Sequence, residues 1–315
     1  MRVAAIDCGT NSIRLLVADV DAATGNGSLV DLDRRMEIVR LGQGVDRTGR
    51  LAPEALERTF AACRNYADVI RTLGAHRVRF VATSATRDAE NRADLLAGVT
   101  EILGVEPSVI TGAEEARLSF VGATRGLGTE ASASPVLVLD IGGGSTEFVL
   151  GDVDVLAACS VDVGCVRLTE RHFARDGSDP PTRARIAAAR ADVDAAIARA
   201  GGSVPLHDAR SLVGLAGTVT TVAAMALGLE HYDPVRIHRS RISADAVQEV
   251  SARLVAMSRA QRAGLGFMHP GRVDVIAAGA LVLAAVVDSV GLPEVIASEH
   301  DILDGIAWSI AADTS

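Results

Sequence analysis

The chain has 315 residues, of which 49% are hydrophobic and 3% aromatic, and its formal net charge is −9. This length suggests about two domains with a large buried core. The negative charge argues against non-specific binding to nucleic acid or to an anionic membrane, and we expect neither as a partner. A polyanionic ligand remains compatible, because a local cluster of cations can override the mean charge.

Two features of the composition restrict the chemistry further. All 31 positions counted as lysine or arginine are arginine, which excludes a Walker A loop, a protein-kinase lysine and Schiff-base catalysis. The four cysteines contain no C-x-x-C pair, so we expect buried thiols in a reducing cytoplasm. No signal peptide follows Met1, and the longest apolar run, residues 275–287, is too short to span a bilayer. We therefore expect a cytoplasmic protein.

The chain begins with a strand–turn–strand unit. Residues 2–7 and 13–20 read as apolar strands, and the turn between them is Asp7-Cys8-Gly9-Thr10-Asn11-Ser12. Glycine permits positive φ and has no Cβ, so backbone N–H groups of such a turn can converge on one anion, and hydroxyl groups can add hydrogen bonds to phosphate oxygens. A third strand at 28–39, after a turn at 21–27, completes a meander.

Helices and short strands alternate through the rest of the first half. Pro53 and Gly74 mark the two ends of the first long helix. The predicted elements are a helix at 53–73, a strand at 77–83, a helix at 91–103, a strand at 108–110 and a helix that opens at 111–115.

Two positions in this region could carry chemistry. Arg87 follows a strand on a turn rich in serine and threonine, where it would clamp a phosphate; a solvated arginine is the alternative. Glu114 and Glu115 open a helix, and adjacent helical residues point about 100° apart, so we expect only one to face a cleft. A glutamate there can take a proton from water that attacks phosphorus, whereas a favourable interaction with the helix dipole is the alternative.

A linker separates the two halves of the chain. Residues 126–135 read GLGTEASASP, which matches G-x-G-x-x-A. No strand precedes this segment, so we interpret it as a hinge rather than as a dinucleotide-binding turn.

The second half opens with a copy of the first strand–turn–strand unit. Residues 136–150 read VLVLDIGGGSTEFVL, and Asp140, Gly142 and Ser145 each stand 133 residues after Asp7, Gly9 and Ser12. Two unrelated hairpins would not be expected to match in register, so the repeat predicts two similar lobes whose turns face each other across a cleft. Asp140 and Glu147 flank the second turn with hard oxygen ligands that suit Mg²⁺. The predicted phosphate-binding residues of this turn are Gly142, Gly143, Gly144 and Ser145.

The elements that follow include a third glycine turn. Gly217 and Thr218 stand where a strand meets a helix, and a helix N-terminus offers N–H groups and positive potential to an anion; a plain tight turn is the alternative. Two other polar segments are more simply explained as a solvated basic loop at 233–241 and as a plain helix start at 269–272. The remaining predictions are strands at 153–163, 212–215 and 294–297 and helices at 165–174, 182–200, 243–257, 270–289 and 302–312.

Five segments, in this order and spacing, resemble the exopolyphosphatase/guanosine pentaphosphate phosphohydrolase family. They are DCGTNS at 7–12, TGAEEA at 111–116, DIGGGSTE at 140–147, GLAGT at 214–218 and SEHDILDG at 298–305. The resemblance covers essentially the whole chain. The resemblance is to the short form of the family, so we do not expect the added C-terminal helical domains of long members.

The resemblance implies a two-lobed, actin-like fold of the ribonuclease H type and Mg²⁺-dependent removal of a terminal phosphate, with Mn²⁺ as a substitute. It places the catalytic glutamate at Glu115, the conserved arginine at Arg87 and the metal-associated carboxylates at Asp140 and Glu147. We expect lobes at 1–125 and 126–315, with the last helix packed back onto the first lobe, and a homodimer. The phosphate-binding residues are then Gly9, Thr10, Asn11, Ser12, Gly142, Gly143, Gly144, Ser145, Gly217 and Thr218.

The expected function is hydrolysis of inorganic polyphosphate from its end, with Glu115 as general base. Hydrolysis of guanosine pentaphosphate (pppGpp) to ppGpp is the alternative within the same class. A kinase of the same fold is less favoured, because no second carbon-substrate motif is evident. A non-catalytic phosphate or nucleotide sensor is a further alternative, and the carboxylates at 115, 140 and 147 argue against it.

Overall fold

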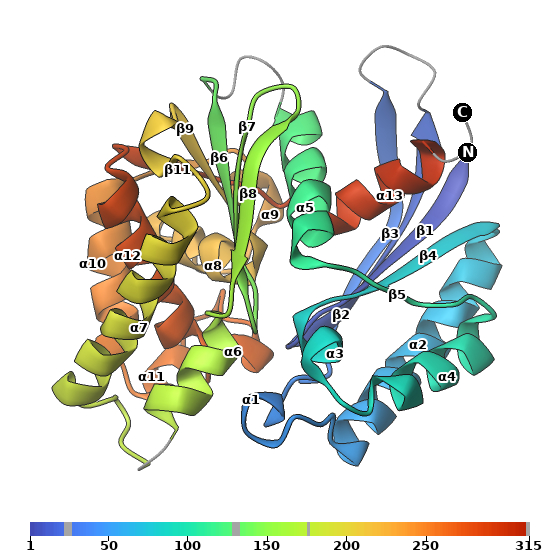
Figure 1. Cartoon of the computed structure of the whole chain (residues 1–315), viewed down its shortest axis with the longest axis horizontal. Coiled ribbons are helices and arrows are strands. Elements are labelled where there is room, and N and C mark those ends of the chain that lie inside the picture. The colour runs from blue at the N-terminus through green and yellow to red at the C-terminus, as the bar shows by residue number, and fades with distance from the viewer. Residues whose placement is uncertain (22–26, 128–132, 175–176, 313–315) are drawn as a thin grey trace. The chain divides into compact units, whose positions relative to one another are not determined.

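The computed structural model describes residues 1–21, 27–127, 133–174 and 177–312 (Figure 1). The chain divides into two compact units: unit 1 comprises Met1–Arg125 with Asp301–Ser315, and unit 2 comprises Gly126–His300. Most of the predicted turn at 21–27 and the middle of the predicted linker at 126–135 lie outside the described residues.

Unit 1 is built on a five-stranded sheet with the order β3-β2-β1-β4-β5. The first three strands form an antiparallel meander, and β4 and β5 run parallel to β1. Buried residues alternate between the two faces of β1, so both faces of the sheet are covered. The strands are β1 (Arg2–Cys8), β2 (Ser12–Asp21), β3 (Ser28–Ile38), β4 (Arg77–Ala82) and β5 (Ser108–Val109).

Helices cover the two faces of this sheet (Figure 1). α2 (Pro53–Leu73) and α4 (Arg92–Leu103) pack on one face around Tyr66 and Phe80, and α13 (Ile302–Ala312) packs on the other through Ile306. The remaining helices are α1 (Val45–Thr48), α3 (Ser84–Asp88) and α5 (Gly112–Leu127).

α5 and α13 approach each other at two glycines. A Cβ on Gly122 would lie 1.8 Å from the carbonyl oxygen of Asp301, and a Cβ on Gly305 would lie 2.0 Å from the carbonyl oxygen of Leu118. Neither backbone leaves room for a side chain at these positions. The residues of the family motif at 298–305 therefore include a glycine that the packing of these two helices requires.

Unit 2 repeats the plan with a six-stranded sheet of order β10-β11-β9-β6-β7-β8. The meander β6, β7, β8 is antiparallel, and β9 lies parallel to β6, as β4 does to β1. The strands are β6 (Val136–Ile141), β7 (Thr146–Gly151), β8 (Val155–Val161), β9 (Ser211–Leu215), β10 (Arg241–Ser243) and β11 (Glu294–Ala297).

The helices of unit 2 enclose one large apolar core. The α-helices are α6 (Cys165–Leu168), α7 (Arg183–Gly201), α8 (Ala216–Ala226), α9 (Pro234–Ile237), α10 (Ala244–Ala256), α11 (Arg259–Ala263) and α12 (Ile276–Val290). Short 3₁₀ turns at Leu206–Asp208 and Pro270–Arg272 connect them.

The strand predictions match closely except that β10 was not predicted, and two helix predictions and one loop prediction are corrected by the structure. The segment 165–174 is not one α-helix, because a π-helix (Thr169–Phe173) follows α6. The segment 233–241, interpreted as a loop, contains α9 and begins β10. The predicted helix at 270–289 starts as a 3₁₀ turn, and α12 begins only at Ile276. Local composition did not distinguish these tight turns from regular helix or loop.

Candidate active site

In unit 1, the predicted phosphate-binding turn joins β1 to β2 and closes with a hydrogen bond of 3.0 Å from Gly9 N to Ser12 O. The carbonyl oxygens of Thr10 and Asn11 accept hydrogen bonds of 2.8–3.1 Å from backbone N–H groups in residues 39–42. Because C=O and N–H of a trans peptide point in opposite directions, the next N–H groups point away from that segment. This orientation is the one that an anion-binding turn requires.

A buried hydroxyl pair supports this turn. Thr10 Oγ1 and Ser84 Oγ lie 2.9 Å apart, and both side chains are buried. Ser84 begins α3 directly after β4, so the pair joins the turn to the neighbouring strand. Gly42 also passes close to the turn, because a Cβ there would lie 2.3 Å from Thr10 Cγ2.

Asp7, at the end of β1, belongs to an ion-pair network. Arg14, directly opposite on β2, donates to Asp7 from Nε at 3.0 Å and from Nη2 at 2.6 Å, and from Nη1 to Asp301. Burial raises the pKa of Asp7 above its usual value, and the Arg14 charge offsets only part of that effect. Burial also acts to raise the pKa of Asp301, but the charges of Arg14 and Arg34 outweigh it and hold that pKa below its usual value.

The predicted catalytic pair, Arg87 and Glu115, is brought together in unit 1. Arg87 Nη1 lies 3.1 Å from Glu115 Oε2 and also donates to the carbonyl oxygen of Ile110 at 3.0 Å. Glu115 is in the first turn of α5 with 8% of its surface exposed. Arg87 therefore fixes a largely buried carboxylate, and a positioned carboxylate is what general-base catalysis requires.

Glu114 binds different partners from its neighbour. Arg79 on β4 donates to Glu114 Oε1 at 2.6 Å and to Ser309 Oγ of α13 at 2.7 Å. The two adjacent glutamates therefore diverge on the helix, as the helical spacing predicts.

In unit 2, the corresponding turn joins β6 to β7 and closes with a 3.0 Å hydrogen bond from Gly142 N to Ser145 O. The carbonyl oxygens of Gly142 and Gly143 accept hydrogen bonds of 2.9–3.1 Å from backbone N–H groups in residues 165–167. The close approach depends on Gly164, where a Cβ would lie 2.5 Å from the carbonyl group of Gly143. The following N–H groups consequently point to the other side of the turn, as in unit 1.

Asp140 and Glu147 face each other directly across β6 and β7. Asp140 is 8% exposed and Glu147 1% exposed, and Ser160 donates to Glu147 Oε1 at 2.7 Å. Among the described residues no group of three or more His, Cys, Asp or Glu side chains could hold a metal ion. Two carboxylates fit Mg²⁺, which binds through one or two carboxylates together with water and substrate phosphates, and do not fit a zinc cage.

The third predicted turn lies at the start of α8. Ala216 has a φ of 62°, and a Cβ on Gly217 would lie 2.3 Å from the guanidinium carbon of Arg272. Thr218 is buried, and its Oγ1 would lie 2.4 Å from a Cβ on Gly279. This turn therefore places backbone N–H groups and an arginine side by side at a helix N-terminus.

Comparison with known proteins shows the family of this chain. A model of the Ppx/GppA phosphatase family matches residues 16–313. The chain belongs to the Ppx/GppA phosphatase family. Exopolyphosphatase 2 of Mycobacterium tuberculosis is 51% identical over 98% of both chains.

Solved structures of Ppx/GppA proteins are similar along their whole length. An exopolyphosphatase-like protein is 42% identical, with a TM-score of 0.94 and complete coverage of both chains. The Ppx/GppA enzyme of Aquifex aeolicus is 30% identical, with a TM-score of 0.80 over 98% of this chain and 99% of that one. The predicted family, the actin-like fold and the class of phosphoanhydride hydrolase are confirmed.

Sequence reasoning missed three polar contacts and one close packing contact of the candidate site. The partner of Asp7 could have been predicted from the repeat. Arg14 follows Asp7 by seven residues, as Glu147 follows Asp140, and each residue lies opposite the other in its pair. The contacts of Arg79, Arg167 and Arg272 carry no comparable signal, because each joins segments that only the folded chain brings together. These contacts are Arg79 with Glu114, Arg167 with Gly144 and Arg272 with Gly217.

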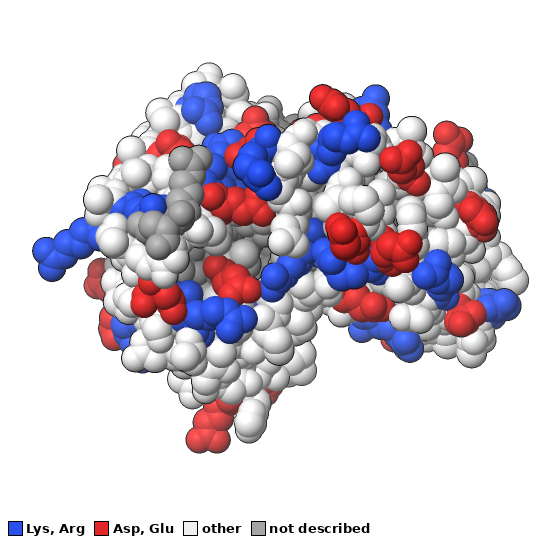
Figure 2. All heavy atoms as spheres, turned by 90° about the horizontal axis from the view of Figure 1, so that it is seen from below, with Lys and Arg blue, Asp and Glu red and all other residues white. Residues whose placement is uncertain are grey.

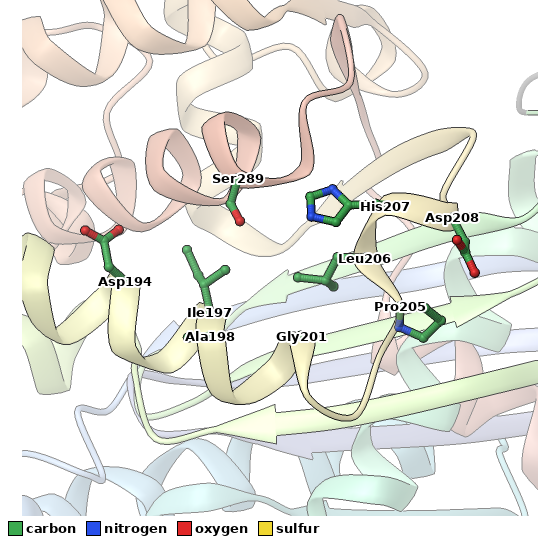
Figure 3. A pocket seen from close by; sticks show the side chains of 9 residues that line it. All are labelled: Asp194, Ile197, Ala198, Gly201, Pro205, Leu206, His207, Asp208 and Ser289. Carbon is green, nitrogen blue, oxygen red and sulfur yellow. The ribbon is translucent and has the colours of Figure 1, made fainter.

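Other surfaces of the protein lie apart from these residues. A pocket of about 440 Å³ on unit 2 is lined by parts of α7, the 3₁₀ turn at Leu206–Asp208 and Ser289, and by none of the predicted site residues (Figure 3). On the face drawn in Figure 2, acidic and arginine side chains are interspersed. Among the described residues, no helix combines the length and apolarity needed to cross a bilayer.

Proposed function

We propose that this protein is an exopolyphosphatase that releases terminal orthophosphate from inorganic polyphosphate. The observation that carries the proposal is the repeated turn, in which backbone carbonyls are held on one side so that N–H groups are presented on the other. Such groups bind phosphate oxygens without lysine, which the chain lacks. The relatives named exopolyphosphatase support polyphosphate as the substrate class.

Glu115 is the proposed general base. It accepts a proton from a water molecule as the water oxygen bonds to the terminal phosphorus and the bond from that phosphorus to the bridging oxygen breaks. The products are orthophosphate and a polyphosphate shortened by one unit. Arg87, 3.1 Å from Glu115, fixes this carboxylate and is the proposed phosphate contact beside it.

Asp140 and Glu147 are the proposed metal-associated residues. Their buried carboxylates lie opposite each other and supply the hard oxygen donors that Mg²⁺ prefers, with Mn²⁺ as a substitute. When bound, the ion neutralises charge on the phosphoryl oxygens. The other proposed phosphate ligands are the N–H and hydroxyl groups of residues 9–12, 142–145 and 217–218.

Hydrolysis of pppGpp is the second candidate, because the matched family joins both activities in its name. The test is phosphate release from polyphosphate and from pppGpp at equal terminal-phosphate concentration, each with Mg²⁺ and with excess EDTA. We expect faster release from polyphosphate and none in EDTA. Faster release from pppGpp would reverse the substrate assignment, and full activity in EDTA would refute the metal requirement.

Two further measurements distinguish the kinase and sensor alternatives. ATP-dependent phosphorylation of a small acceptor would indicate a kinase, and tight binding without turnover would indicate a sensor. We also propose a cytoplasmic homodimer; all four cysteines are free thiols, as expected in a reducing compartment. Light scattering during size-exclusion chromatography measures the oligomeric state directly.

A further inference from the structure

Arg167 lies against the glycine turn of unit 2 and has no role in the mechanism proposed above. Its Nε donates a hydrogen bond of 2.7 Å to the carbonyl oxygen of Gly144. The side chain is half-buried and comes from α6, which begins where Gly164 packs onto the turn. The backbone N–H groups of residues 165–167 already donate to the carbonyl oxygens of Gly142 and Gly143, and this side-chain bond adds a donor for the next carbonyl.

The equivalent carbonyl in unit 1 is held in another way. Asn11, which stands where the repeat places Gly144, has its carbonyl oxygen bound by the backbone N–H groups of Val39 and Arg40, at 3.1 and 2.9 Å. In unit 2 the side chain of Arg167 supplies a hydrogen bond to the corresponding oxygen. The orientation of one peptide in the second turn therefore depends on a residue that can be substituted.

That peptide needs an external restraint. Gly142, Gly143 and Gly144 follow one another, and glycine has the widest choice of backbone conformations. Holding the carbonyl oxygen of Gly144 fixes the plane of the Gly144–Ser145 peptide. Because the N–H group points opposite to the C=O group, it also directs Ser145 N–H to the anion-binding side of the turn.

We propose that Arg167 is a positioning residue for phosphate binding, acting through the carbonyl oxygen of Gly144. This inference rests on the proposed function, because it assumes that the turn at 142–145 holds a phosphate group. Arg167 acts here by a hydrogen bond to the turn and not by its charge on the substrate.

Two substitutions of matched length separate these roles. In Arg167→Gln the amide nitrogen stands at the same number of bonds from Cα as Nε of arginine, so the donor is kept and the charge is removed. In Arg167→Met a methyl group occupies that place, so both are removed. Loss of a hydrogen bond to a charged group corresponds to roughly 10- to 100-fold in affinity.

The measurement is the Kd of tripolyphosphate, determined by calorimetry on the full chain in excess EDTA, where we expect no hydrolysis. Arg167→Met should weaken binding by about 10-fold or more, and Arg167→Gln should stay within a few-fold of the wild type. Arg185→Met is the matched control, because Arg185 also donates to a carbonyl oxygen, that of His172 at 2.6 Å, but away from the turn. It should bind tripolyphosphate as the wild type does.

The inference is overturned if Arg167→Met binds normally, or if Arg167→Gln is as weak as Arg167→Met, since the charge and not the donor would then matter. Wild-type protein that binds tripolyphosphate but releases no phosphate when Mg²⁺ is supplied would refute the proposed hydrolysis, and the comparison of the two variants would still decide the role of Arg167. Wild-type protein that does not bind it would refute both.

Discussion

The meanders that open unit 1 and unit 2 share one backbone arrangement and carry different charges. Their cross-strand pairs recur 133 residues apart, so that Val3 opposite Ala18 becomes Val136 opposite Gly151. In each, the turn closes with the same hydrogen bond of 3.0 Å between its first and fourth residues. The fold therefore supplies the same turn twice, and it is this turn that we propose to bind phosphate.

The two copies carry different charges at one matched cross-strand pair. Asp7 lies opposite Arg14 in unit 1, whereas Asp140 lies opposite Glu147 in unit 2. The first pair is an ion pair that neutralises its own carboxylate, whereas two carboxylates directly opposite each other repel. The comparison teaches that one difference between two copies of the same backbone can replace an ion pair by two carboxylates, which is the pair to which we assign the metal.

Glu115→Gln should have the largest effect of the variants that test this division between the units. We expect unit 1 to supply the base, and Gln keeps the size of the side chain while removing the proton acceptor. Turnover should fall by roughly 10²–10⁴-fold, because that is the usual contribution of a general base. The measurement is kcat for phosphate release from polyphosphate with saturating Mg²⁺.

Glu114→Gln is the control for that variant. Its side chain is bound by Arg79 and diverges from Glu115, so kcat should stay within a few-fold of the wild type. The reverse pattern would identify Glu114 as the base. Normal turnover in both variants would show that the general base is not on this helix.

Arg14→Met tests the ion pair that distinguishes unit 1. It leaves the buried carboxylates of Asp7 and Asp301 without their shared partner, and breaking a buried pair costs about 3–5 kcal/mol in the free energy of unfolding. Without Arg14, both interactions that lower the pKa of Asp7 are lost, and burial raises that pKa further in the folded state, so the folded state binds more protons than the unfolded state. Thermal stability of the variant should therefore rise as the pH falls from 7 to 5.

Arg2→Met is the matched control, because Arg2 and Asp19 form a two-bonded pair at the surface of the same sheet. Its Tm should change little, since exposed ion pairs contribute little to stability. An unchanged Tm in Arg14→Met would show that the buried network does not stabilise unit 1.

Gly305→Ala should have the smallest effect of the three, and it tests how α13 is held on the sheet of unit 1. The new Cβ would lie 2.0 Å from the carbonyl oxygen of Leu118, so the backbones must separate, at about 1–3 kcal/mol. Chemical denaturation measures this loss. Gly201→Ala is the control in α7, where a Cβ meets only Leu206 Cδ1 at 3.8 Å, and it should not destabilise the protein. Equal stability of both variants would mean that the contact at Gly305 relaxes freely.

Much of the fold was readable from the sequence, because it depends on local patterns. Apolar runs ending at glycine turns located the strands, and Pro53 and Gly74 marked a helix to the residue. The π-helix at Thr169–Phe173 and the short strand β10 were not predictable, because packing rather than composition determines them.

Part of the candidate site could be predicted from short segments of the sequence. Asp140 and Glu147 flank one glycine turn, and the match of that turn to the first one implies Arg14 opposite Asp7. The contact of Arg167 with Gly144 could not be inferred, because it requires the close approach at Gly164. The hydrogen bond from Arg79 to Glu114 joins β4 to α5, and no spacing in the sequence predicts it.

The concentration of Mg²⁺ that gives half-maximal phosphate release, measured at saturating polyphosphate, tests the division of roles most directly. We compare the wild type with Glu147→Gln in unit 2 and Glu115→Gln in unit 1. Glu147→Gln should raise this concentration by about 10-fold or more, as loss of a group at a metal site usually does. Glu115→Gln should lower kcat and leave the half-maximal Mg²⁺ concentration unchanged. The assignment of the metal to the carboxylate pair of unit 2 would be contradicted if Glu147→Gln left the half-maximal Mg²⁺ concentration unchanged, or if only Glu115→Gln changed it.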